Sequence, residues 1–262
     1  MLLATATGAS EGPGSGETAA RPAELFAQGM AGAAAGDLEG ALDRLEAAVA
    51  AVPDNLRWGA EYRQVVIRAG EHDRGLGFFE GLLEAHPESS NLVLNYAYAH
   101  VDKIPAAGAI TQVILANQAL TQFGRALELR ESWLARYTRG NSYVYWPRIF
   151  GRTPLGIADL ERAIEMARAM EKRSYHAFAW AALGDGYWRL GELGKAREVW
   201  QEGLARHPAD ARLQARLSRT AEELDAFLEE LLSPATRVGT DLRELWEAGW
   251  QGACDCDPEL GR

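Results

Sequence analysis

The sequence predicts an all-α protein, a solenoid of about five helical hairpins, two of them with insertions, followed by a C-terminal capping helix. Three observations support this fold class. Gly36 and Gly70 are 34 residues apart, and so are Pro53 and Pro87. Each glycine lies between two amphipathic helical patterns, and each proline ends the second pattern. The two cysteines of the chain lie near its end, so helix packing and not disulfide bonding has to stabilise the fold.

The clearest hairpin is predicted over residues 177–210. Its pattern resembles the tetratricopeptide repeat (TPR) family, in which a first helix reads W-x-x-L-G-x-x-Y, a second reads A-x-x-x-F, and a proline follows. Trp200 replaces the phenylalanine of the family pattern, and Gly191 is the turn glycine. The matching residues are Trp180, Leu183, Gly184, Tyr187, Ala196, Trp200 and Pro208. This resemblance implies a right-handed superhelical solenoid of TPR hairpins with a concave binding surface.

Each matching position has a physical reason. Gly184 and Ala196 are small, so the two helices of the hairpin can approach each other closely. Trp200 fills the space between hairpins, and Pro208 stops the second helix because it cannot donate the next backbone hydrogen bond.

The same spacing places four more hairpins. The second departs from the family pattern, because Arg63 stands where a glycine-type residue is expected. After the last hairpin, the apolar periodicity predicts one amphipathic capping helix and then a short helix at about 240–250. We expect a disordered leader at 1–21, repeats at 22–55, 56–89, 90–132, 133–170 and 177–210, a capping helix at 211–232, and an irregular tail with the short helix at 233–262.

Two hairpins are longer than the 34-residue period. The third has ten extra residues in or near the stretch KIPAAGAITQ, residues 103–112. The fourth has four extra residues, Pro147–Phe150, between Trp146 at the end of its first helix and the turn glycine Gly151. We expect Ile149 and Phe150 to pack against a neighbouring hairpin, with a second contact surface for a partner as the alternative.

Composition and motifs narrow the function. The formal charge of −10 disfavours binding to nucleic acid, and no stretch approaches the length of a membrane span. P-loop, G-x-S-x-G and H-E-x-x-H motifs are absent, and the five histidines are scattered. Cys254 and Cys256 could offer two thiolates to a soft metal, but two ligands do not make a site, so a flexible tail is the preferred interpretation. We therefore predict no enzyme, no cofactor and no metal.

The TPR resemblance also implies a partner-binding groove. In that family, defined positions of each first helix line the inner surface of the superhelix. Carried onto this chain, those positions are Arg57, Gln64, Arg68, Asn91, Tyr98, Asp102, Tyr137, Asn141, Tyr145, Asp185, Trp188 and Arg189. Aromatic rings, amides and guanidinium groups suit an extended peptide. The alternative is that these side chains are solvated helix faces.

These inferences predict a non-catalytic scaffold or adaptor that binds a protein or peptide in the concave groove. Two alternatives stay open. The chain could self-assemble as a homo-oligomer, or its own C-terminal helix, with Trp246 and Trp250, could fill the groove.

The N-terminus leaves the compartment open. As the chain is written, a cytoplasmic location is expected, because no basic region and no full apolar region of a signal peptide is present. Ala4-Thr5-Ala6 resembles a signal-peptide cleavage site, so export to the periplasm is expected if the true start lies upstream of Met1.

Overall fold

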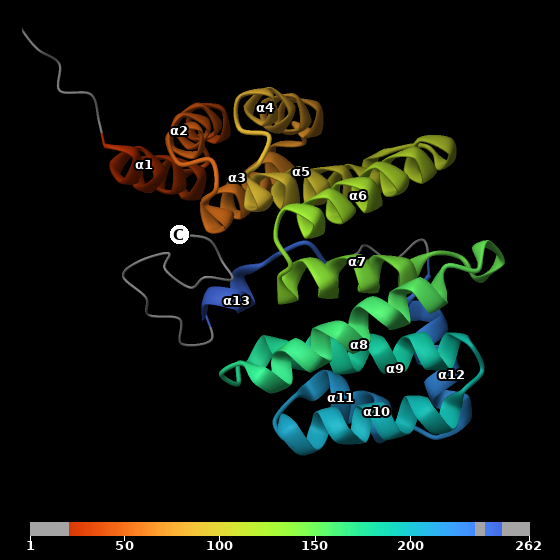
Figure 1. Ribbon diagram of the computed structural model, residues 1–262. Coiled ribbons are helices and arrows are strands. Elements are labelled where there is room, and N and C mark those ends of the chain that lie inside the picture. The colour runs from red at the N-terminus through yellow and green to blue at the C-terminus, as the bar shows by residue number, and fades with distance from the viewer. Residues whose placement is uncertain (1–20, 234–238, 248–262) are drawn as a thin grey trace, which may run out of the picture.

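The computed structural model describes residues 21–233 and 239–247, and within them the chain is helical without strands (Figure 1). The α-helices are α1 (Pro22–Ala35), α2 (Leu38–Ala51), α3 (Leu56–Ala69), α4 (His72–Ala85), α5 (Ser90–Lys103), α6 (Ala109–Leu129), α7 (Trp133–Tyr145), α8 (Thr153–Ala169), α9 (Ala177–Arg189), α10 (Leu193–Arg206), α11 (Ala211–Leu217), α12 (Ala221–Leu231) and α13 (Arg243–Glu247). Three 3-10 turns are η1 (Ile104–Ala106), η2 (Arg148–Phe150) and η3 (Ser174–His176). The leader 1–20, Trp250 and both cysteines lie outside the described residues.

The first ten helices pair into five hairpins that stack along the molecule, α1–α2 to α9–α10. One continuous apolar cluster runs through the stack. Gly36 and Gly191 follow the first helices of two hairpins with backbone φ angles of 91° and 81°, a left-handed conformation that glycine adopts without steric cost. The predicted all-α solenoid of helical hairpins is confirmed.

The small residues of the repeat pattern lie at close helix contacts. A Cβ atom built on Gly184 of α9 would be 2.1 Å from Nε1 of Trp200 on α10. The Trp200 indole N–H donates to the carbonyl of Ala181 at 3.1 Å, and its side chain is fully buried. Gly29 of α1 lies in the same way against Leu45 of α2. The packing role inferred for Gly184 is therefore confirmed.

The second hairpin is the looser one. Its helices α3 and α4 pack less closely against each other than the helices of the other four hairpins do. Tyr62, and not Arg63, is the large side chain of α3 that faces α4, because the Arg63 side chain points to α5. Three aromatic rings fill the space, since Tyr62 meets Phe78 and Phe79 edge-on with ring centroids 5.0 and 5.6 Å apart. The Tyr62 hydroxyl donates to Glu46 of α2 at 2.7 Å.

Both predicted insertions lie between the helices of their hairpins. The first forms η1 and lengthens α6, and the second forms η2, which ends at Gly151 with a φ of 62°. The expectation that Ile149 and Phe150 pack on a neighbouring hairpin is wrong. Ile149 is 89% exposed, and Phe150 is 48% exposed with its ring edge-on to Trp146 of its own hairpin.

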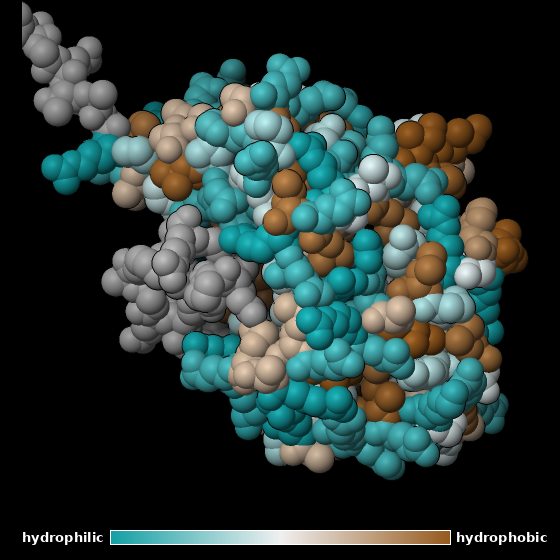
Figure 2. Space-filling model, viewed as in Figure 1, coloured by the Kyte–Doolittle hydropathy of each residue, from teal (hydrophilic) through white to brown (hydrophobic). Residues whose placement is uncertain are grey.

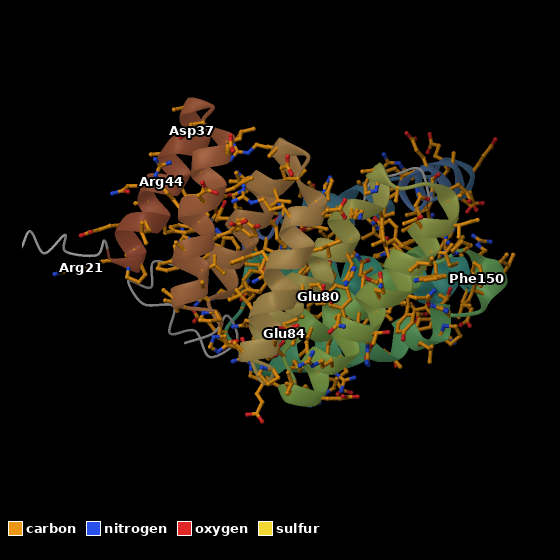
Figure 3. All side chains as sticks on the ribbon, turned by 90° about the horizontal axis from the view of Figure 1, so that it is seen from above. Arg21, Asp37, Arg44, Glu80, Glu84 and Phe150 are labelled. Carbon is orange, nitrogen blue, oxygen red and sulfur yellow. The ribbon has the colours of Figure 1, made fainter. Side chains whose placement is uncertain are left out.

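The physical reason is that η2 projects from the end of its hairpin. Figure 3 shows Phe150 at the opposite end of the molecule from Arg21 and Asp37. Figure 2 shows apolar surface where α6 begins and around η2, among otherwise hydrophilic surface. The exposed apolar residues of these two insertions and the start of α8 are Ile110, Val113, Ile114, Ile149, Phe150 and Leu155. A partner contact at this patch stays a prediction.

The expected single capping helix at 211–232 is two helices, α11 and α12. Thr220 begins α12 with a capping box, in which its hydroxyl accepts from the Glu223 amide at 3.3 Å and the Glu223 carboxylate accepts from the Thr220 amide at 2.9 Å. The apolar periodicity continues across this break, so the pattern alone suggested one helix. The short helix α13 lies within the range expected for it.

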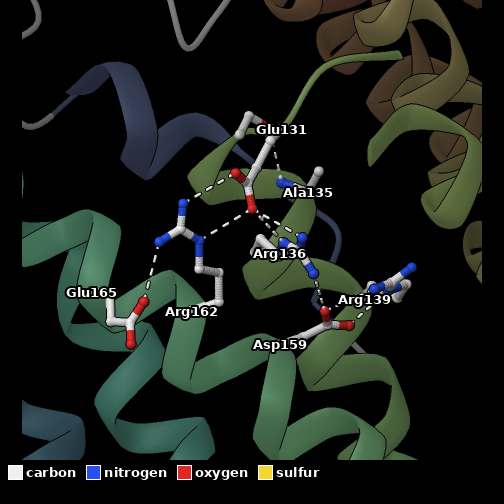
Figure 4. Close-up of polar contacts among 8 residues, drawn as sticks. Glu131, Ala135, Arg136, Arg139, Asp159, Arg162 and Glu165 are labelled. Carbon is white, nitrogen blue, oxygen red and sulfur yellow. Dashed lines mark hydrogen bonds and ion pairs between the residues drawn. The ribbon is translucent and has the colours of Figure 1, made fainter. Parts of the chain in front are cut away.

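Charged side chains connect α7 and α8 on the side shown in Figure 4. The buried carboxylate of Asp159 accepts from Arg136 at 2.8 Å and from Arg139 at 2.6 Å. Glu131 accepts from Arg136 and Arg162, and Arg162 also pairs with Glu165 at 3.1 Å. Asp159 is the buried member, so its loss would leave two arginines without their shared acceptor.

We predict that Gly184→Ala lowers the free energy of unfolding by about 1–3 kcal/mol, because the added methyl overlaps a rigid buried indole. Gly81→Ala is the matched control. Gly81 lies in α4 with no atom within 4 Å of an added Cβ, so alanine should stabilise the chain by about 0.5–1 kcal/mol. Urea denaturation of both variants measures the difference, and equal effects would contradict the close contact.

We predict that Asp159→Ala lowers the free energy of unfolding by about 1.5–3 kcal/mol, the range for hydrogen bonds to charged groups. Glu165→Ala removes an exposed carboxylate from the same network and should change it by less than about 0.5 kcal/mol. Thermal unfolding followed by circular dichroism tests the pair. Equal losses would show that Asp159 has no special role.

Candidate functional site

The candidate site is the inner face, by which we mean the surface of α3, α5, α7 and α9 that is turned toward the C-terminal part of the chain (Figure 1). Of the twelve residues expected to line a groove, Arg57 and Arg68 are exposed, and Gln64, Tyr137, Asn141 and Tyr145 are half-buried. The other six are buried: Asn91, Tyr98, Asp102, Asp185, Trp188 and Arg189. The expectation of an exposed aromatic and polar face is therefore wrong for half of the set, because the chain itself covers them.

A buried ion pair lies at the centre of the N-terminal half of this face. Arg63 of α3 is 1% exposed and donates to Asp102 of α5 at 2.8 Å. Its Nε donates to the side-chain oxygen of Asn95 at 3.2 Å. The Arg63 guanidinium also lies 4.6 Å from the ring centroid of Tyr98, whose hydroxyl is 2.6 Å from that of Thr138. Helices α3, α5 and α7 are thus joined by polar contacts that are shielded from water.

The C-terminal segment 239–247 lies on this ion pair. The backbone carbonyl of Thr240 accepts from Arg63 at 3.2 Å and from Gln64 at 3.5 Å. The Thr240 hydroxyl donates to the second carboxylate oxygen of Asp102. Thr240 is 3% exposed, and both of its polar groups are matched by charged or amide groups of the inner face.

Apolar side chains hold the rest of this segment. Leu242, Leu245 and Trp246 are buried at 8%, 3% and 7% exposure. The guanidinium of Arg57 lies 5.8 Å from the Trp246 ring centroid, within the range of a cation–π contact. Glu61 lies on α3, the helix of Arg57. Burial raises the pKa of Glu61, and the charges of Arg243 and Arg57 partly offset this increase.

The C-terminal half of the inner face holds α11 and α12. Arg216 of α11 donates twice to the carboxylate of Asp185 on α9, at 2.6 Å each, and both side chains are buried. The Trp188 indole N–H donates to Asp225 of α12 at 2.6 Å. Such a two-point arginine–carboxylate contact fixes orientation as well as charge.

Two tyrosines lie between the halves. Burial raises the pKa of Tyr137 and that of Tyr145, and Arg216 on α11 counteracts the shift at both hydroxyls. Tyr137 stacks on Trp133 with ring centroids 5.2 Å apart. These tyrosines thus face the chain's own helices rather than open solvent.

The remaining predicted residues have other surroundings. Asn91 donates to the carbonyl of Asp54 at 2.9 Å and accepts from Arg130 at 2.7 Å, so it connects neighbouring hairpins. Arg189 donates to the carbonyl of Trp146 at 2.9 Å, and burial lowers its pKa. Arg68 and Asn141 keep exposed or half-exposed positions on α3 and α7.

Within the described part of the chain, no three histidine, cysteine or acidic side chains are placed to hold a metal ion. The same residues include no helix that is both long enough and apolar enough to cross a bilayer. His100 and His176 are buried packing residues, and burial lowers the pKa of each to about 4. Their surroundings suit neutral imidazoles in the core.

Known proteins agree with this architecture. Residues 177–220 match the family model described as tetratricopeptide repeat. This stretch covers α9, α10 and α11 and identifies the fifth hairpin as a tetratricopeptide repeat. Among solved structures, a thermophilic TPR protein from Thermus thermophilus is similar, with a TM-score of 0.53 and 20% sequence identity over 76% of this chain and 97% of that one. A TPR protein from Parabacteroides merdae has a TM-score of 0.53 and 17% identity, over 87% of this chain and 79% of that one. No curated protein matches by sequence.

The list of predicted groove residues lacked three residues that lie at this inner face: Arg63, Glu61 and Thr240. Trp246 had been named in the alternative that the chain's own C-terminal helix fills the groove. Arg63 carried a signal, since it breaks the repeat pattern at a position where the pattern requires a small residue. Thr240 carried none, because its contacts with α3 and α5 join residues that are far apart in the sequence.

We predict that the buried histidines make stability depend on pH. Their pKa is about 4 when folded and about 6.5 when unfolded, so the unfolded chain binds more protons between these values. Their contribution is complete above pH 6.5 and is lost as the pH falls toward 4, on the order of 1–3 kcal/mol per residue. In addition, Nδ1 of His176 accepts from the Arg173 amide at 3.3 Å, a bond that protonation removes.

Chemical denaturation at pH 7 and pH 4.5 tests this prediction. The double variant His100→Gln/His176→Gln should show a smaller difference between the two pH values than the unaltered chain. His86→Gln is the control, because His86 is exposed in a turn. A pH dependence that the double variant leaves unchanged would contradict the assignment.

Proposed function

We propose that this protein is a non-catalytic scaffold whose inner face binds a segment of a protein partner. TPR arrays are in general protein-interaction scaffolds, and this chain has their fold. The observation that carries the proposal is the polar contact at Thr240. There the inner face holds an extended piece of polypeptide through its backbone carbonyl and its side-chain hydroxyl together.

The chemistry of the face supports this assignment. Donors and acceptors on α3 and α5 are fixed by helix packing, which reduces the entropy lost when a peptide binds. Exposed arginines flank the buried ion pair and offer charge-assisted hydrogen bonds to a partner. The proposed contact residues are Arg57, Gln64, Arg68 and Asp102 of the predicted set, together with Arg63 and Glu61.

A peptide-display selection on the intact chain tests the function. We predict that selected peptides bind the inner face, so the double variant Arg57→Glu/Arg68→Glu should weaken them by about tenfold, the equivalent of about 1.4 kcal/mol. Both arginines are exposed, so these reversals leave the core unchanged.

The matched control is Arg44→Glu/Lys195→Glu, which reverses two charges on the second helices α2 and α10. It should leave the affinity of the selected peptides within about twofold. Failure to select any peptide, or equal loss in both double variants, would count against binding at the inner face.

A further inference from the structure

We propose that residues 239–247 are an intramolecular ligand of the inner face, and that the partner segment has the same chemistry. This chemistry is a serine or threonine that binds Arg63 and Asp102, followed six residues later by a tryptophan. The inference rests on the proposed function, because it names the partner class for that site and the way the site is regulated.

The site for the hydroxyl residue exists independently of its occupant. Arg63 is oriented by Asp102 and Asn95, which belong to α5, and not by the C-terminal segment alone. Without Thr240, one guanidinium nitrogen and one carboxylate oxygen would still point to the same place. This pair of groups matches a carbonyl and a hydroxyl on one residue, so it selects threonine or serine over residues without a hydroxyl.

The second part of the site is apolar with a charged border. Trp246 lies in it, bordered by Arg57 and Glu61, and Leu245 is buried beside it in the chain. A tryptophan under a guanidinium combines buried area with a cation–π contact, a pairing that is typical of strong anchor residues at interfaces. The spacing from Thr240 to Trp246 therefore defines the register of the recognised segment.

The segment depends on this site for its form. The described part of helix α13 spans five residues, and a helix of that length does not persist in water by itself. The segment 239–247 makes polar contacts with other elements. Thr240 is hydrogen-bonded to residues of α3 and α5, and Glu244 accepts twice from Arg212 of α11 at 3.0 Å. The segment is thus bound to the array in the way a peptide ligand is.

Occupancy by the chain's own segment regulates access. A tethered ligand is present at an effective concentration on the order of millimolar, so a partner meets a site that is free for only a fraction of the time. The apparent affinity for the partner falls by that fraction. Releasing the segment removes this reduction, and the partner then binds more tightly without any new contact.

A labelled peptide with the sequence of residues 239–247, GTDLRELWE, tests the proposal on the full chain by fluorescence anisotropy. The variant Thr240→Val/Trp246→Ala frees the inner face, and we expect it to bind the peptide at least tenfold more tightly than the unaltered chain. The control Thr111→Val changes an exposed threonine on α6 and should bind the peptide as the unaltered chain does.

Changes in the peptide test its chemistry. With the freed variant, a peptide carrying valine in place of the threonine should bind about tenfold more weakly, and a peptide carrying serine should bind within about threefold. Equal affinity of the unaltered and freed chains for GTDLRELWE would overturn the proposal, and so would equal binding of the valine peptide. If circular dichroism shows that the double variant has lost helicity, Thr240→Val alone replaces it, with an expected gain of severalfold and the same overturning result.

The two proposals fail in different ways. If display peptides bind the inner face but do not compete with GTDLRELWE, the intramolecular ligand is wrong and the scaffold function stands. If no foreign peptide binds the inner face of either the unaltered or the freed chain, the scaffold function itself is wrong.

Discussion

The buried guanidinium of Arg63 is the constraint on which the inner face depends. A charge taken out of water destabilises a protein by several kcal/mol unless hydrogen-bonding partners surround it. Asp102 and Asn95 supply part of that environment from α5, and the carbonyl of Thr240 supplies the rest from a distant part of the chain. The position of the C-terminal segment therefore follows from the polar groups of α3 and α5 as much as from its own apolar residues.

The regular repeats contribute helix packing, and the irregular second repeat contributes a buried charged group to the inner face. Where the small residue is kept, as at Gly184, the hairpin closes on a buried indole and only packing results. In the second hairpin, α3 and α4 stand further apart, and the rings of Tyr62, Phe78 and Phe79 fill the interface. The same helix α3 also carries the buried charged group Arg63, which faces α5 and the inner side. Local departures of this kind mark functional positions in otherwise consistent folds.

The sequence predicted the hairpins well because their signals are local. Glycine turns, proline stops and apolar periodicity act within one repeat, so they can be read without knowing the rest of the structure. The break between α11 and α12 was missed because the apolar period continues through it, although Thr220 and Glu223 form a recognisable capping box. The exposure of Ile149 was missed because burial depends on what lies opposite a side chain, which periodicity does not state.

The difference between local signals and long-range contacts also explains which features of the inner face the sequence predicted. The repeat register placed Asp102, Asp185 and Trp188 at positions that contact the C-terminal part of the chain, as the bonds to Thr240, Arg216 and Asp225 show. The register alone could not decide between a foreign occupant and the alternative that the chain's own C-terminal helix fills the groove, since those contacts join residues far apart in sequence. The sequence showed Arg63 only as a departure from the repeat pattern. Asp102 was predicted as a groove residue, but its ion pair with Arg63 was not predicted.

The two halves of the inner face differ in how firmly they are filled. Helix α11 follows α10 directly after a short turn, and its Arg216 is buried in a two-point contact with Asp185. Removing either partner would leave a buried charge alone, so this half behaves as part of the scaffold. The segment 239–247 holds only the described part of helix α13, and when the segment leaves, Arg63 and Asp102 still neutralise each other. A self-sufficient ion pair beneath a short removable segment is what an exchangeable site requires, because release then uncovers no unpaired charge.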